Sequence, residues 1–245
     1  MRLAGKTAIV TGASRGIGAA IAKRFAAEGA KIIVNYRSNA SAAKAVVQAI
    51  EADGGHAMAL QADIANPKEV NAMVAATMTE FDHLDILVNN AGWAKLQTLD
   101  EIEPATIEAQ LATNVTGLIL ATQAASREMN SGGRVINISS IAAKGGAGGS
   151  VYSATKAAGN ALTKCYAAEL GPRGITVNAV APAAVETDLY YEVGLDQNHE
   201  RSLAATPLGR IGDVDDVAHA ALFFASEDAA WITGEILQVS GGKAM

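Results

Sequence analysis

The stretch TGASRGIG, residues 11–18, lies between an apolar run at residues 7–10 and a helical pattern over residues 17–28. Its three glycines let the chain turn tightly from a strand into a helix. The start of a helix offers unpaired N–H groups and the positive end of the helix dipole, which suit a phosphate group. The spacing is G-x-x-x-G-x-G rather than the G-x-G-x-x-G fingerprint, and there is no Walker lysine. A tight turn without a ligand is the alternative at this point.

Apolar runs and helical patterns alternate along the rest of the chain. The expected strands are residues 7–10, 31–35, 56–61, 86–89, 134–139, 176–181 and 236–239. The expected helices are residues 17–28, 40–52, 67–81, 104–130 with a possible break, 152–170 and 213–225. This alternation predicts a single α/β domain over residues 1–245, a doubly wound, Rossmann-type, seven-stranded parallel sheet with helices on both faces. Residues 188–208 lack a clear strand and are interpreted as a lid on the substrate side.

Composition narrows the function classes. The chain has 245 residues, a formal net charge of -6, 50% hydrophobic residues and one cysteine. The negative charge argues against non-specific nucleic-acid binding. No apolar run approaches the ~18 residues that span a bilayer, so no membrane partner is expected. A single cysteine excludes an intramolecular disulfide, which fits a cytoplasmic setting. No metal site is predicted.

The end of the second expected strand bears on the cofactor. In dinucleotide-binding folds an acidic residue there binds the ribose hydroxyls of NAD, whereas a basic residue accommodates a 2′-phosphate. Here Tyr36 stands at the acidic position, Arg37 follows it, and Arg15 belongs to the glycine turn. Two guanidiniums favour a phosphate dianion. NADP(H) is therefore preferred over NAD(H), unless both arginines are simply solvated surface charges.

Tyr152 and Lys156 are four residues apart and share one helix face. An ammonium near a phenol favours the phenolate, so we expect Lys156 to lower the pKa of Tyr152 and to make it a usable proton donor. Ser139 and Ser140 end a strand at the same carboxyl edge of the sheet. A purely structural Tyr/Lys pair is the alternative.

Taken together, the motifs resemble those of the short-chain dehydrogenase/reductase family. They occur in order over essentially the whole chain: TGASRGIG, Ala62-Asp63, the NNAG stretch at residues 89–92, Asn114, Ser139-Ser140, and YSATK at residues 152–156. The pattern is similar to that of 3-oxoacyl-carrier-protein reductase-like carbonyl reductases. The resemblance also implies a homotetramer, or else a dimer.

The resemblance implies catalytic roles for four residues. Tyr152 is the general acid in reduction and the base in oxidation, Lys156 also binds the nicotinamide ribose, and Asn114 holds a water in a proton relay. Strand register selects Ser140 as the catalytic serine, although the family's usual spacing to the tyrosine would select Ser139.

The implied cofactor-binding residues are Gly12, Ser14, Arg15, Gly16, Ile17, Gly18, Tyr36, Arg37, Asp63, Ile64, Asn90, Ala91, Gly92, Tyr152, Lys156, Pro182, Val185 and Thr187. Asn89 either shapes the wall behind the adenosine ribose or stabilises the central sheet. One departure from the family is Ala183, where a glycine usually follows the proline.

The resulting prediction is an NADPH-dependent oxidoreductase that reversibly reduces a ketone or aldehyde to an alcohol. The expected substrate is a small molecule with an apolar body, because the candidate pocket residues are mainly apolar. They are Trp93, Leu96, Ala142, Ala147, Tyr190, Tyr191 and Leu195. The alternatives are a 3-oxoacyl-carrier-protein reductase, a sugar dehydrogenase and, from another class, a non-catalytic NADP(H) sensor.

Overall fold

The computed structural model describes residues 1–243, and for residues 197 and 198 the backbone alone. The strands are β1 (Thr7–Val10), β2 (Lys31–Tyr36), β3 (His56–Gln61), β4 (Ile86–Asn89), β5 (Arg134–Ile138), β6 (Thr176–Pro182) and β7 (Ile236–Val239). The α-helices are α1 (Gly16–Ala27), α2 (Ala40–Ala52), α3 (Pro67–Phe81), α4 (Pro104–Leu111), α5 (Gly117–Glu128), α6 (Ser150–Leu170), α7 (Asp188–Glu192), α8 (His199–Ala204) and α9 (Val214–Ala225).

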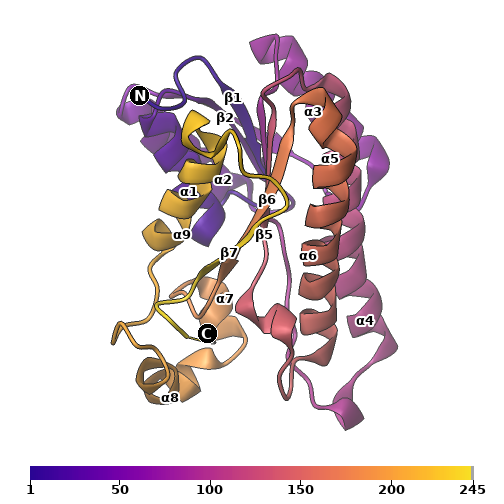
Figure 1. The fold of residues 1–245 in the computed structure, drawn as a ribbon, viewed down its shortest axis with the longest axis vertical. Helices are drawn as coiled ribbons and strands as arrows, with labels where there is room; N and C mark the ends of the chain where they lie inside the picture. Colours follow the sequence, from indigo (N-terminus) through magenta and orange to yellow (C-terminus); the bar gives the residue numbers. More distant parts are fainter. Residues whose placement is uncertain (244–245) are drawn as a thin grey trace.

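The seven strands form one parallel sheet in the order β3-β2-β1-β4-β5-β6-β7. Figure 1 shows α1, α2 and α9 on one side of this sheet and α3, α5 and α6 on the other. The predicted fold class is therefore confirmed. The strand order reverses between β1 and β4, and at such a point open α/β sheets bind their ligands outside the carboxyl ends of the strands.

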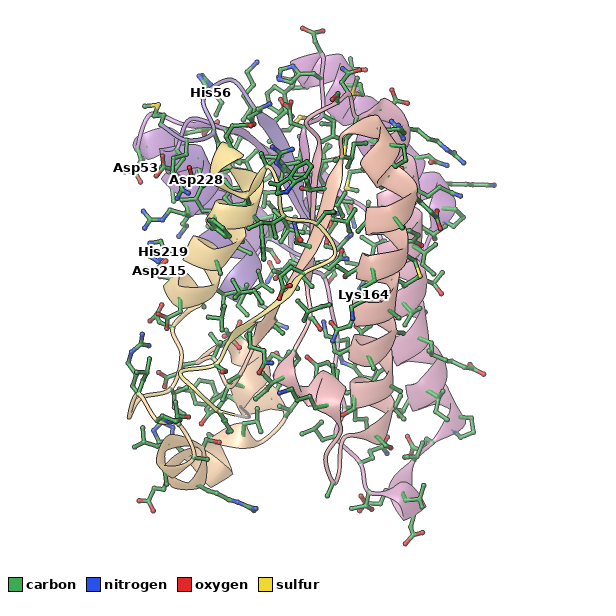
Figure 2. The ribbon with its side chains drawn as sticks, in the orientation of Figure 1. Asp53, His56, Lys164, Asp215, His219 and Asp228 are labelled. Atoms are coloured by element: carbon green, nitrogen blue, oxygen red, sulfur yellow. The ribbon has the colours of Figure 1, made fainter. Side chains whose placement is uncertain are left out.

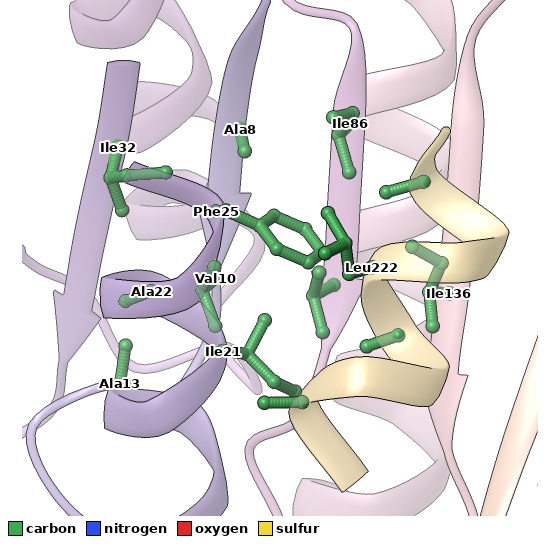
Figure 3. Close-up of a cluster of buried hydrophobic side chains, with 14 of the residues drawn as sticks. Ala8, Val10, Ala13, Ile21, Ala22, Phe25, Ile32, Ile86, Ile136 and Leu222 are labelled. Atoms are coloured by element: carbon green, nitrogen blue, oxygen red, sulfur yellow. The ribbon is translucent and has the colours of Figure 1, made fainter. Parts of the chain in front are cut away.

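Alternate residues of β1, β2, β4 and β5 belong to two hydrophobic cores, one on each face of the sheet. Val10 packs into the core under α1, α2 and α9, whereas Ile9 faces the core under α3, α5 and α6. In Figure 3 the ring of Phe25 on α1 points towards Leu222 on α9, above the strands. Burial on both faces explains why the strands are almost continuously apolar in sequence.

The largest departure from the expected elements is the long helix over residues 104–130. It divides into α4, a π-helical turn (Ala112–Thr116) and α5, which ends at Glu128. The expected lid contains two short helices, α7 and α8, joined by a 3₁₀ turn (Leu195–Asn198). Among residues 1–243, no helix combines the length and apolar character that crossing a membrane requires.

Candidate functional site

The glycine turn leads from β1 directly to the first residue of α1. Gly12 and Gly16 have φ values of +62° and +56°, which other residues rarely adopt. A Cβ atom on Gly18 would lie 2.6 Å from the carbonyl oxygen of Gly12 and would also collide with the amide of Asn90. The turn therefore depends on glycine at all three positions.

Hydrogen bonds fasten the segment after β4 to this turn. The hydroxyl of Thr11 accepts hydrogen bonds from the backbone N–H groups of Asn90 and Ala91, both at 3.0 Å. The Asn90 amide donates to the carbonyls of Thr11 (2.9 Å) and Gly12 (3.1 Å). The two loops at the reversal of strand order thus form one wall.

Asn89 has the structural role that was one of its two predicted alternatives. Its amide donates to the Thr122 hydroxyl and to Asn137 Oδ1, both at 2.9 Å, and Asn137 donates to the Thr163 hydroxyl at 2.9 Å. This buried network joins β4 and β5 to α5 and α6.

A further amide, that of Asn35 on β2, joins the turn to a third loop. Asn35 Oδ1 accepts a hydrogen bond from the N–H of Gly12 at 3.1 Å. Its Nδ2 donates to the carbonyls of Leu60 (3.3 Å) and Ala62 (3.1 Å). This residue was not predicted, although an asparagine inside an apolar strand indicates that its amide has buried partners.

One cavity of about 860 Å³ runs along the carboxyl edge of the sheet. All eighteen residues predicted to bind the cofactor line it, and so does Ser140. Asn114 lies behind this lining. The residues fit a dinucleotide, because the cavity holds a glycine cradle that side chains would fill, the N-terminus of a twelve-residue helix and two guanidiniums. Every part of the predicted site except Asn114 therefore faces one continuous space.

The two arginines at the adenosine end differ in their surroundings. Arg37 is exposed. Arg15 Nη1 donates to Glu192 Oε1 at 2.6 Å and to Asp188 Oδ2 at 3.1 Å, and both carboxylates belong to α7. The hydrogen bond to Glu192 is the main cause that raises the pKa of Arg15 above its usual value. Sequence reasoning missed both acids, which lie more than 170 residues from Arg15 in the chain.

The two serines after β5 point to different partners. The Ser139 hydroxyl donates to Asn160 Oδ1 at 2.6 Å and is buried. The Ser140 side chain hydrogen-bonds the Tyr152 hydroxyl and also accepts a hydrogen bond from the N–H of Ala142 at 3.1 Å. Ser140 is thus the serine next to the phenol, as strand register suggested.

We expect Ser140→Ala to lower kcat by about 10²-fold, the loss typical of one donor to a developing oxyanion. Ser139→Ala removes a buried hydrogen bond and should lower the free energy of unfolding by about 1 kcal/mol, with less than a fivefold effect on kcat. Steady-state kinetics and thermal melts of both variants check this. A larger loss of kcat in the Ser139 variant would reverse the assignment.

Tyr152 and Lys156 lie on one face of α6, as their spacing predicted. The Lys156 ammonium is 5.7 Å from the centre of the Tyr152 ring and donates a hydrogen bond to the Ile138 carbonyl at 2.8 Å. Both residues are partly accessible from the cavity, but their polar ends lie deep among other atoms.

The expected acidification of Tyr152 by Lys156 is wrong for this structure. Burial raises the pKa of Tyr152 to about 12, and the hydrogen bond from Ser140 offsets only part of that rise. Burial likewise lowers the pKa of Lys156 to about 8. Removing both groups from water disfavours their charged forms more than their mutual attraction favours them. The site therefore holds a neutral phenol that is ready to donate a proton.

Asn114 lies in the π-helical turn, and its side chain holds a neighbouring loop. Its Oδ1 accepts from the N–H of Trp93 at 2.9 Å, and its Nδ2 donates to the Trp93 carbonyl at 2.8 Å and to the Thr155 hydroxyl at 3.0 Å. These bonds commit the amide to fixing Trp93 and α6. A water in the predicted relay would need another group of this residue, such as its backbone carbonyl.

The structure places five of the seven candidate pocket residues on the wall of the cavity. Trp93, Leu96, Ala142, Tyr190 and Leu195 line the cavity. Tyr191 does not lie on the described wall, because its side chain turns outward and its hydroxyl donates to Glu186 at 2.6 Å.

Ala147 also lies outside the described lining and is exposed. Lining residues that sequence reasoning missed include Asn35, Lys144, Leu189, Val193, Ser202 and Lys243.

Comparison with known proteins agrees with this geometry. A family model described as enoyl-(acyl carrier protein) reductase matches residues 12–244. A 3-oxoacyl-[acyl-carrier-protein] reductase of Synechocystis sp. is 43% identical, and the match covers 99% of this chain and 98% of that protein. Versicolorin reductase 1 of Aspergillus parasiticus is 39% identical, with 98% and 97% covered. A crystal structure of a short chain dehydrogenase from Burkholderia cenocepacia in complex with NADP superposes with a TM-score of 0.94 at 43% identity, covering 99% of each chain.

Proposed function

Because the chain belongs to the short-chain dehydrogenase/reductase family of oxidoreductases, we propose that it reversibly reduces a ketone or aldehyde to an alcohol with NADPH. The observation that carries this proposal is that Tyr152, Ser140 and the glycine turn all face one cavity of about 860 Å³. A proton donor and a phosphate cradle thus share the space in which a carbonyl compound and a dinucleotide would meet.

The chain's own residues supply positioning and the proton. Bound NADPH provides the hydride, as this cofactor does in other oxidoreductases. The hydroxyls of Ser140 and Tyr152 donate hydrogen bonds to the carbonyl oxygen and stabilise the negative charge that develops there. Tyr152 then transfers its proton to that oxygen, and the ammonium of Lys156 stabilises the resulting phenolate. A phenol with a pKa raised to about 12 stays protonated at neutral pH, which favours the direction of reduction.

The preference for NADP(H) rests on Arg15 and Arg37. Both line the adenosine end of the cavity, and Tyr36 occupies the position where NAD-binding folds place an acid. The Burkholderia cenocepacia structure contains NADP. The substrate end is bordered by Trp93 and Tyr190, which suits a small molecule with an apolar body.

A cofactor-consumption screen of ketones, aldehydes and alcohols with NADPH and NADH tests this function. We expect turnover of at least one carbonyl compound, with kcat/KM at least tenfold higher with NADPH than with NADH. Tight NADPH binding without turnover on the whole panel would instead favour the non-catalytic NADP(H) sensor.

Reduction of a 3-oxoacyl group on its carrier protein is the second candidate, supported by the Synechocystis relative. An acidic carrier protein needs a basic docking face, and Arg173, in the 3₁₀ turn that follows α6, is a cation that could belong to one. Arg173 Nη2 instead donates to the carbonyls of Ser126 (2.7 Å) and Met129 (2.8 Å) at the end of α5. We therefore place the reduction of free carbonyl compounds first. Measuring the activity on one ketone in its free form and in its carrier-bound form distinguishes the two candidate functions.

We also propose a cytoplasmic homotetramer. The support is that β7 forms an edge of the sheet and that nearby Trp231 is fully exposed, while Leu237 on β7 is partly exposed. An exposed apolar edge of this kind favours pairing with another copy of the chain. Light scattering in solution tests the assembly.

A further inference from the structure

The contact between the glycine turn and α7 links the two sides of the cofactor cavity. Arg15 comes from the turn at the start of α1, and Asp188 and Glu192 come from α7, which follows β6. Figure 1 places α7 beyond the carboxyl ends of the strands. All three residues line that cavity.

The two carboxylates contact the guanidinium of Arg15, which the proposed function assigns to binding of the 2′-phosphate. Both hydrogen bonds use Nη1 of Arg15, at 2.6 Å to Glu192 and 3.1 Å to Asp188. The two carboxylate oxygens contact the guanidinium much as two oxygens of a phosphate dianion would. A bound 2′-phosphate and these carboxylates would therefore share one guanidinium.

We propose that Asp188 and Glu192 are cofactor-specificity residues that compete with the 2′-phosphate of NADP(H) for Arg15. This rests on the proposed function, in which Arg15 faces that phosphate. The competition lowers the affinity for NADP(H) and leaves the affinity for NAD(H), which lacks the phosphate, unaffected. The competition affects Arg15 but not Arg37. Arg37 has no acidic partner among the described residues and keeps its full attraction for the phosphate.

Exposure sets the size of the effect. The side chains of Arg15, Asp188 and Glu192 are 54%, 61% and 48% exposed, so water screens each pair. Exposed pairs of this kind correspond to about a two- to fivefold change in an equilibrium constant. Glu192 makes the shorter bond, so its removal is expected to have the larger effect.

The test compares two probes that differ only in the phosphate at the 2′ position, adenosine 2′,5′-bisphosphate and adenosine 5′-monophosphate. Titration calorimetry gives Kd for each without any turnover. We expect Glu192→Gln to lower the Kd of the bisphosphate about two- to fivefold and to leave that of the monophosphate unchanged. Glu200→Gln, the same change of charge on exposed α8, is the control and should alter neither Kd.

A second background separates competition for Arg15 from general repulsion. We expect Arg15→Gln to weaken binding of the bisphosphate alone, and Glu192→Gln to have no further effect in the Arg15→Gln protein. If Arg15→Gln weakens the bisphosphate but Glu192→Gln leaves it unchanged or weakens it, the competition is wrong and the proposed cofactor preference stands. An equal gain with and without Arg15, or with Glu200→Gln, also overturns the competition. If Arg15→Gln has no effect on the bisphosphate, both the competition and this role of Arg15 fail.

Discussion

Tyr152→Phe is expected to lower kcat for carbonyl reduction by about 10³-fold, within the range attributed to a positioned general acid. The change removes one hydroxyl and keeps the ring that packs in α6. NADPH should therefore bind with a Kd within about twofold of the original, since the phosphate cradle around Gly12 and Arg15 is untouched. Steady-state kinetics and a fluorescence titration with NADPH measure the two quantities separately.

Tyr166→Phe is the matched control for this prediction. Tyr166 lies on the same helix, α6, but packs against the core under α3 and α5, away from the cavity. Its phenol should be dispensable for turnover. An unchanged kcat in Tyr152→Phe, or an equal loss in Tyr166→Phe, would remove Tyr152 from its proposed role.

Lys156→Met is expected to change activity and stability in opposite directions. The loss of the ammonium beside Tyr152 should lower kcat by about 10²-fold or more. Burial lowers the pKa of Lys156 from 10.5 to about 8, so the folded protein holds its charged form at a cost. Methionine keeps the apolar stem without the charge. The lowered pKa corresponds to about 3 kcal/mol at pH 7, and loss of the hydrogen bond to the Ile138 carbonyl offsets about 1 kcal/mol of this. The free energy of unfolding should therefore rise by about 2 kcal/mol, which corresponds to a Tm increase of about 5 °C.

The sign of the pH dependence follows from the same pKa. The unfolded chain binds this proton more tightly than the folded one, so the penalty is complete below about pH 8 and fades as the pH rises towards 10.5. The stability gain of Lys156→Met should shrink over that range. Lys164→Met, an exposed position on α6 labelled in Figure 2, is the control and should shift Tm little at any pH. A Tm of Lys156→Met below that of the original protein would contradict the buried-charge argument.

Much of the fold could be predicted because each element carries its own signal. Strands covered on both faces are continuous apolar runs. The sequence Asn66-Pro67 is typical of a helix start, and in α3 the Asn66 side chain accepts a hydrogen bond from the N–H of Lys68. The π-helical turn had no such local signal. It accompanies hydrogen bonds between Asn114 and Trp93, which the fold alone brings together.

In the candidate site, too, some features could be predicted from local sequence signals and others could not. Gly12, Ser140 and Tyr152 could be placed together because they follow parallel strands, whose carboxyl ends share one edge of the sheet. The ion pairs of Arg15 and the burial of the Lys156 ammonium could not be predicted from the sequence. An interval of four residues shows that Lys156 is near Tyr152, but not how many other atoms exclude water from them, and that exclusion decides both pKa values.

The side-chain amide of Asn35 affects how rigid the cavity is before a ligand binds. It ties the backbone of Gly12 to those of Leu60 and Ala62, so the loops after β1 and β3 hold one arrangement before anything enters between them. A dinucleotide arriving there restricts little of the polypeptide. The entropy lost on binding then comes mainly from the translational, rotational and conformational freedom of the ligand, and this part of the cavity behaves as a rigid receptor.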